Sequence, residues 1–139
     1  MMKPNIGELG WLVGKNDLTI KEVPAAGREV IARGNCEVLV ISMGEDGAML
    51  LTKDTELIVK PPCVEKRSTV GAGDSMVAGI VLQLSRNKDI REAFLYGVAS
   101  GTAATMNSGT ELCHRQDVDK LYEELLSLYK MNVIPEVCQ

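Results

Sequence analysis

A lone carboxylate follows a run of small residues in RSTVGAGDSMVAGI, residues 67–80. Gly71 and Gly73 permit a tight turn, and Asp74 stands at the start of an apolar run that predicts a helix. Free N–H groups and the positive dipole end of a helix start suit a phosphoryl group. An aspartate beside such an anion hole can accept the proton of a substrate hydroxyl as an O–P bond forms. The structural alternative is a helix N-cap, and without context a G-A-G-D turn is more often a capped helix start.

Two other phosphate-binding loops fit the sequence poorly. A Walker A loop needs G-x-x-x-x-G-K-[ST], but the pair Gly14-Lys15 is followed by Asn16. A dinucleotide fingerprint starting at Gly71 has Met76 where its third glycine belongs, although a divergent NAD site stays open. The turn before Asp74 therefore keeps two interpretations, a capped helix start and a site for phosphoryl transfer.

Composition indicates one soluble globular unit, because 139 residues with 45% apolar residues are enough for a single core. The net charge is -4 and no basic block occurs, so nucleic acid is not an expected partner. Apolar runs are far shorter than a membrane span, and no basic-then-apolar leader opens the chain. We expect a cytoplasmic protein without membrane contact.

Four scattered cysteines, Cys36, Cys63, Cys113 and Cys138, form no C-x-x-C pair, and His114 is the one histidine. A zinc site is therefore not expected, and buried reduced thiols are. Cys113 beside His114 is given little weight as a nucleophile and base, because sequence neighbours rarely face one another.

Helical spacing and turn residues predict two helices in the first third of the chain. Asn5 caps the first, in residues 5–14, and the second runs from Pro24 to Gly34. Three strands follow, and the first is a β-branched run of the kind buried on both faces of a parallel sheet. The strands are expected at residues 37–44, 48–54 and 56–62, with a turn at residues 54–55.

The second half of the chain predicts three helices. Residues 74–84 are apolar nearly all the way round, and residues 89–107 are rich in Gly, Ala and Ser, so both segments are expected to be buried. Residues 117–130 have one apolar stripe, acids early and a lysine last, which predicts a surface helix. The mixture of strands and helices indicates a layered α/β fold, and no linker divides residues 1–139.

Four segments together resemble the ribokinase-like PfkB carbohydrate kinases. STVGAGDSMVAGIV, residues 68–81, is similar from end to end to the second signature of that family. KPNIGEL is similar to its K-P-N-x-x-E segment and SMGEDGAML to its S-x-G-x-x-G nucleotide loop. GTAATMNSGTEL is similar to its adenine-side helix and loop, most closely in 6-phosphofructokinases of the minor type, 1-phosphofructokinases and tagatose-6-phosphate kinases.

The resemblance implies the C-terminal part of a ribokinase-like layered α/β/α fold, and ATP-dependent phosphorylation of a sugar phosphate in carbohydrate metabolism such as glycolysis. Asp74 would be the general base, and the amides of Gly71, Ala72 and Gly73 would form the anion hole. Lys3 would reach the ATP phosphates. The other nucleotide-lining positions would be Asn5, Ser42, Gly44, Glu45, Asp46 and Gly47, with Lys66, Val98 and Thr102 around the adenosine.

Cations are implied in the same way. Asn5 and Glu8 would belong to an element that organises hydrated Mg²⁺, and some family members also bind a monovalent cation such as K⁺. Position 68 is often Asp in the family, and Glu111 stands where related phosphosugar kinases can carry a basic residue. The positions that match the monovalent site are Ser68, Val70, Ala104, Asn107 and Gly109.

Each of these positions also has a structural interpretation, which we favour for every position except Asp74 when it is taken singly. Asn5 and Glu8 are typical of a helix start with an acid in its first turn. Gly44 and Gly47 are typical of a strand-to-strand turn, and Lys66 of a solvated surface charge.

The family's sugar-binding residues lie chiefly in an N-terminal half with a small β lid, and nothing in this sequence matches that half. We expect a truncated chain, a split gene product or a degenerate remnant, with the missing half as a possible partner and self-association through the uncovered faces. The alternatives to a phosphosugar kinase are a non-catalytic nucleotide-binding fragment and a nucleoside kinase of the same superfamily.

Overall fold

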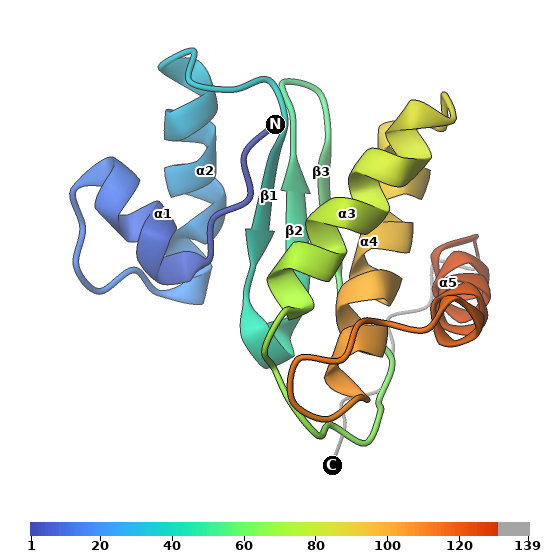
Figure 1. Cartoon of the computed structure of the whole chain (residues 1–139). Coiled ribbons are helices and arrows are strands. Elements are labelled where there is room, and N and C mark those ends of the chain that lie inside the picture. The colour runs from blue at the N-terminus through green and yellow to red at the C-terminus, as the bar shows by residue number, and fades with distance from the viewer. Residues whose placement is uncertain (131–139) are drawn as a thin grey trace. The chain divides into compact units, whose positions relative to one another are not determined.

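A computed structural model describes residues 1–130 of the chain, and Cys138 lies outside the described residues. The chain divides into two compact units, Met1–Val59 and a second unit that begins at Lys60. Figure 1 shows the sheet with α1 and α2 in the first unit and α3, α4 and α5 in the second. The predicted mixture of helices and strands is confirmed, and the fold is α/β.

The first unit opens with two helices close to their predicted positions. α1 (Ile6–Val13) is capped by Asn5 and ends at Gly14, whose φ of 75° suits glycine. After a short 3₁₀ turn, η1 (Ile20–Glu22), α2 runs over Val23–Ala32 with a proline in its first turn. The sequence therefore located both helix starts to within one residue.

The three strands pair as an antiparallel meander, which corrects the expected parallel sheet. β1 (Leu39–Ser42), β2 (Ala48–Leu51) and β3 (Glu56–Val59) lie in the order β1-β2-β3. The connections between them hold only four or five residues, which is too short for the crossover that parallel neighbours need. Parallel pairing occurs instead where the N-terminal segment runs along β1, through bridges of Met2 to Leu39 and of Asn5 to Ser42.

The core of the first unit lies between this sheet and its two helices (Figure 1). Gly27 of α2 lets the helix approach closely, since a Cβ there would lie 2.4 Å from Cδ1 of Leu51. Alternate residues of the sheet on the opposite face, such as Val40 and Leu50, are also fully buried. Burial on both faces explains why β1 and β2 are apolar runs, whereas β3 is exposed at Glu56 and Ile58. The main core residues are Leu9, Val23, Val30, Leu39, Ile41, Met49 and Leu51.

In the second unit, α3 (Ala72–Ser85) packs along α4 (Ile90–Thr105). Every residue of α4 from Ala93 to Thr105 is buried, as predicted. α3 differs from the prediction, because only the side that carries Met76, Gly79 and Ile80 is buried. Val81 is 51% exposed, so the all-round apolar pattern of this helix does not correspond to all-round burial within the chain.

α5 (Arg115–Lys130) is the predicted surface helix, with the stripe Val118, Leu121 and Leu125 buried. Tyr96 of α4 attaches it, because the Tyr96 hydroxyl donates to Oδ1 of Asp119 at 3.1 Å and the Tyr96 and Tyr122 rings meet edge to face. Burial and this carboxylate raise the pKa of Tyr96. The apolar stripe of α5 and the buried Tyr96 thus hold α5 against α4.

The described cysteines differ in state. Cys36 and Cys113 are half-buried free thiols, and burial raises the pKa of Cys36. Cys63 is exposed, which corrects the expectation of a buried thiol there. His114 contacts Glu111, with 2.8 Å between Nε2 and Oε1, on the loop that carries Cys113.

Among residues 1–130, no helix is both long enough and apolar enough to span a membrane.

Candidate active site

The glycines before Asp74 form a specific turn. In what we call the GAG turn, residues 69–73, the Ala72 N–H donates to the Thr69 carbonyl at 3.4 Å. Gly71, the third residue of this turn, has φ 79° and ψ -3°, which are the values of a type II turn and require glycine. A Cβ at Gly71 would meet nothing within 4 Å, so the requirement is conformational and not steric.

The turn leads into an uncapped helix start. Gly71 is the N-cap of α3 and no side chain caps the helix. The first intrahelical bond runs from the Ser75 N–H to the Gly71 carbonyl at 2.9 Å, while the Gly73 and Asp74 N–H groups find no acceptor in residues 1–130. Free donors at the positive end of a helix dipole are the physical basis of an anion site.

Asp74 lies in the first turn of α3 and not at its cap, which corrects the structural alternative for this residue. Its side chain is exposed and makes no hydrogen bond or ion pair within the described part of the chain. A carboxylate that a fold uses for capping would bond a backbone N–H, as Glu8 does elsewhere in this chain. The geometry leaves the Asp74 carboxylate available to an external donor such as a hydroxyl.

Backbone contacts of α4 hold the entry to the turn. The Thr105 carbonyl accepts the N–H groups of Arg67 and Ser68 at 2.7 and 3.2 Å. The Ser68 hydroxyl donates to the Gly109 carbonyl at 3.0 Å and accepts from the Val70 N–H at 3.2 Å. Sequence reasoning missed Thr105, because a contact made by a backbone carbonyl leaves no residue-type signal.

The expected positions of a monovalent cation are only partly gathered. Hydrogen bonds link Ser68 to Val70 and Gly109, whose carbonyl is the kind of oxygen that such a cation takes. The Asn107 side chain instead donates to the Leu112 carbonyl at 2.8 Å, and Ala104 is buried in α4. The grouping of these five positions as a cation site stays a prediction.

In the first unit, the K-P-N-x-x-E segment forms a reciprocal cap. Oδ1 of Asn5 accepts the Glu8 N–H at 2.9 Å, and Oε2 of Glu8 accepts the Asn5 N–H at 2.8 Å. Beside this capping box, Nζ of Lys3 donates to the Ser42 hydroxyl at 3.1 Å. The helix-start interpretation of Asn5 and Glu8 is thus confirmed as geometry, while both side chains remain exposed.

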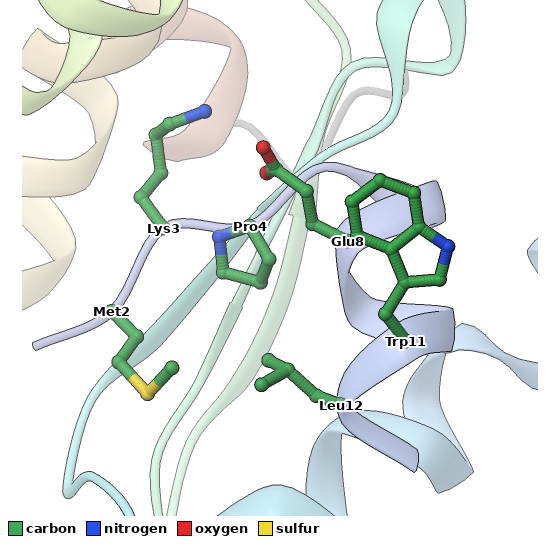
Figure 2. A pocket seen from close by; sticks show the side chains of 6 residues that line it. All are labelled: Met2, Lys3, Pro4, Glu8, Trp11 and Leu12. Carbon is green, nitrogen blue, oxygen red and sulfur yellow. The ribbon is translucent and has the colours of Figure 1, made fainter. Parts of the chain in front are cut away.

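Figure 2 shows how Lys3 and Glu8 lie at a pocket of about 480 Å³. In this view the Glu8 carboxylate points toward the side on which the Lys3 ammonium extends, and the Trp11 indole lies on the other side of the Glu8 side chain. Residues 1–130 hold no cluster of three or more His, Cys, Asp or Glu side chains that could bind a metal directly. Mg²⁺ takes few carboxylates and keeps its waters, so it fits one exposed carboxylate such as Glu8. The lining residues are Met2, Lys3, Pro4, Glu8, Trp11 and Leu12.

The predicted nucleotide loop is a short turn between β1 and β2. Residues Gly44–Asp46 form a 3₁₀ turn, η2, and are exposed, while Gly47 has φ 93°. The Met43 N–H donates to the Gly47 carbonyl at 2.8 Å and closes the loop. The strand-to-strand interpretation of both glycines is therefore confirmed, and it is compatible with backbone approach of a phosphate.

The predicted adenosine contacts lie in different surroundings. Lys66 is exposed on the segment before the GAG turn. Val98 and Thr102 are buried in α4, at 2% and 8% exposure, and the Thr102 hydroxyl donates to the Val98 carbonyl at 2.8 Å. Both therefore contribute to packing in the described chain, and their contact with adenosine stays a prediction.

Comparison with known proteins places this geometry in a family. Residues 1–117 match the pfkB family carbohydrate kinases. The ATP-dependent 6-phosphofructokinase isozyme 2 of Escherichia coli K12 is 40% identical over 125 residues, which are 90% of this chain and 40% of that protein. The 1-phosphofructokinase of Bacillus subtilis is 36% identical over 113 residues, 80% of this chain and 37% of that protein. The chain thus spans about two fifths of the length of these relatives.

Solved structures agree. The phosphofructokinase-2 from Escherichia coli in complex with potassium superposes with a TM-score of 0.84 at 40% identity, covering 89% of this chain and 40% of that one. A ribokinase from Thermotoga maritima, at 23% identity, gives a TM-score of 0.77 over 87% of this chain. The second likeness concerns the fold alone. It shows that a ribokinase shares this fold with the phosphofructokinases over the part that the chain covers.

Proposed function

The chain belongs to the pfkB family of carbohydrate kinases, and from that premise we propose that it carries the nucleotide-binding, base-carrying part of an ATP-dependent phosphosugar kinase. The acceptor class is inferred from relatives that are 6-phosphofructokinases and 1-phosphofructokinases. The observation that carries the proposal is the uncapped start of α3, where free N–H groups lie beside the exposed Asp74.

In the proposed mechanism, a carboxylate oxygen of Asp74 accepts the proton of an acceptor hydroxyl. The oxygen of that hydroxyl, and not the carboxylate, forms a bond to the γ-phosphorus while the bond from phosphorus to the β,γ-bridging oxygen breaks, and ADP leaves. The N–H groups of Gly73 and Asp74 donate to the charge that builds on the transferred group. Mg²⁺, when bound, neutralises phosphate charge, and Glu8 would hold one of its waters. Lys3, steadied by Ser42, adds a positive charge for the ATP phosphates.

Phosphoryl transfer also needs the acceptor hydroxyl held in line with the γ-phosphate. Since this chain spans about 40% of the Escherichia coli relative, we propose that the acceptor-holding residues belong to the part of such kinases that it does not cover. The described chain alone should then bind Mg-ATP without phosphorylating a sugar. We propose the cytoplasm as the location of the chain. We also propose that it associates with further copies of itself, since the Escherichia coli phosphofructokinase-2 has a tetrameric inhibited form.

A non-catalytic nucleotide-binding module is the second candidate function, because the free N–H groups of Gly73 and Asp74 suit a phosphate whether or not the Asp74 carboxylate reacts. It shares ATP binding with the first proposal but assigns no task to the Asp74 carboxylate. Activity in the presence of the part of the relatives that this chain does not cover therefore distinguishes the two.

Calorimetry of Mg-ATP binding to the purified chain is the direct test. We expect binding that the Asp74→Asn chain retains and that the Lys3→Ala chain weakens. Next, the chain is mixed with an N-terminal fragment of the Escherichia coli 6-phosphofructokinase isozyme 2, and ADP release is measured with fructose 6-phosphate. If the mixture releases ADP and the Asp74→Asn variant abolishes this release, the kinase proposal is supported. If the chain binds ATP but no mixture releases ADP, the non-catalytic module is supported. No ATP binding by the wild-type chain would contradict both.

A further inference from the structure

We propose that Gly101 of α4 is a positioning residue for the GAG turn. Because glycine has no side chain, the start of α3 can approach α4 closely at this residue. The distance between the two helices in turn sets the orientation of the N–H groups of the turn. The inference rests on the proposed function for its consequence, and on packing within the second unit for its geometry.

The contact itself is specific to the turn. A Cβ at Gly101 would lie 3.0 Å from the carbonyl oxygen of Ala72 and 3.3 Å from Cβ of Met76. Both distances are tighter than ordinary Cβ contacts, so a methyl group there would displace its neighbours by a few tenths of an ångström. Ala72 is the middle residue of the G-A-G sequence and the first residue of α3.

Planarity of the peptide bond links this contact to the anion site. The Ala72 carbonyl and the Gly73 N–H belong to the same rigid peptide group. A push on the carbonyl oxygen therefore tilts the Gly73 N–H, which finds no acceptor in residues 1–130. Donors that stabilise developing charge work only within a narrow range of distance, so a small tilt has a large effect on anion binding.

A second contact of α4 completes the support. Thr105 lies four residues after Gly101, on the same face of the helix, and its carbonyl accepts the N–H groups of Arg67 and Ser68. One face of α4 thus holds the entry to the turn by hydrogen bonds and its exit by close approach. The exposed apex at Val70 and Gly71 lies between these two supports.

The same helix pair supplies a matched control. Gly79 of α3 faces Ser100, where a Cβ would lie 2.4 Å from Oγ and 2.9 Å from Cβ. This clash is harsher than that at Gly101, but it lies two helical turns further along α3, away from the GAG turn. A packing role predicts that Gly79→Ala does more damage in every measurement, whereas a positioning role predicts that the two variants separate.

The experiment uses the whole chain in three forms: wild type, Gly101→Ala and Gly79→Ala. Thermal unfolding by circular dichroism gives Tm, ¹⁵N NMR follows the backbone amides of Gly73 and Asp74, and calorimetry gives the Kd for Mg-ATP. We expect Gly79→Ala to lower Tm more while leaving these amides and the Kd near wild type. We expect Gly101→Ala to lower Tm less, shift the Gly73 amide and raise the Kd about tenfold.

The proposal is overturned if Gly101→Ala leaves the Gly73 amide and the Kd unchanged, or if both variants raise the Kd in proportion to their loss of Tm. A Gly101→Ala chain that does not fold would also overturn it, since Gly101 would then be a general packing residue. If the wild-type chain binds no Mg-ATP, the proposed function fails, while the Gly73 amide in the two variants still decides whether Gly101 positions the turn.

Discussion

Two helix starts in this molecule carry an acid at the same position, and they use it differently. Glu8 is the third residue of α1 and Asp74 the third residue of α3. At α1 the acid reaches back to the N–H of Asn5 and completes a capping box. At α3 the N-cap is Gly71 in a left-handed conformation, which offers no side chain, and Asp74 stays exposed. An acid in a first turn thus indicates chemistry only where the cap leaves donors unused.

Removing the carboxylate charge at α3 should have the largest effect. In an enzyme assembled with the part of the relatives that this chain does not cover, we expect Asp74→Asn to lower kcat by roughly 10²-fold or more and to leave ATP affinity near normal, because only the proton acceptor is lost. Steady-state assays of ADP release with fructose 6-phosphate measure both quantities. Turnover equal to wild type would remove Asp74 from the mechanism and with it the contrast between the two starts.

The glycine that replaces a capping side chain is the next test. Gly71→Ala must hold alanine at φ 79°, so we expect the free energy of unfolding to fall by about 1 kcal/mol and Mg-ATP binding to weaken. Gly14→Ala is the matched control, since Gly14 has φ 75° and also has nothing within 4 Å of its Cβ position. Urea unfolding and calorimetry should show equal losses of stability but weaker ATP binding only for Gly71→Ala. Equal binding in both variants would make the GAG turn structural.

At α1 the cap and the charge can be separated. Glu8→Gln keeps a side-chain oxygen for the Asn5 N–H, whereas Glu8→Ala removes the cap, so we expect only the alanine variant to lose about 0.5–1 kcal/mol of stability. If Glu8 also holds a water of Mg²⁺, both variants should need more Mg²⁺ for half-maximal ATP binding. Magnesium titrations that match wild type for Glu8→Gln would restrict Glu8 to capping.

The smallest effect concerns the start of η1, which has a capping box as α1 does and where Glu22 accepts hydrogen bonds from Thr19 and Lys15. The Thr19 N–H and hydroxyl and the Lys15 ammonium lower the pKa of Glu22 from 4.5 to about 2. Because the folded pKa lies below the unfolded value, the carboxylate stabilises the fold above pH 4.5, and this contribution is lost as pH falls toward 2. Unfolding of wild type and Glu22→Gln should therefore differ at pH 6 and converge near pH 2. A constant difference would assign the effect to shape and not to charge.

Sequence patterns predicted the helices and strands well because their signals are local. Asn5 and Pro24 mark helix starts, and the stripe through Leu121 marks the buried side of α5. The direction of strand pairing was predicted wrongly, since a buried β-branched run looks the same in parallel and antiparallel sheets. The short connections between the strands, which allow only antiparallel pairing of neighbours, indicate the correct direction.

Site residues could be predicted from the sequence where the residue type determines the geometry. They could not be predicted where the contact is made by backbone atoms. Gly71 at positive φ and the exposed Asp74 agree with the phosphoryl-transfer hypothesis. The carbonyl of Thr105 and the close approach at Gly101 depend on how two helices pack, and no local pattern encodes that distance. The Lys3 contact with Ser42 joins residues far apart in sequence, which only the fold brings together.

Trp11 gives the first unit an optical reporter. It is the single tryptophan of the chain, it is 75% exposed, and it lines the pocket beside Glu8 (Figure 2). An indole in water emits at long wavelength, so any molecule that covers this pocket should shift its fluorescence to the blue. Excitation at the red edge of tryptophan absorption avoids the three tyrosines. Occupancy beside the capping box can thus be followed in real time, without a label and without turnover.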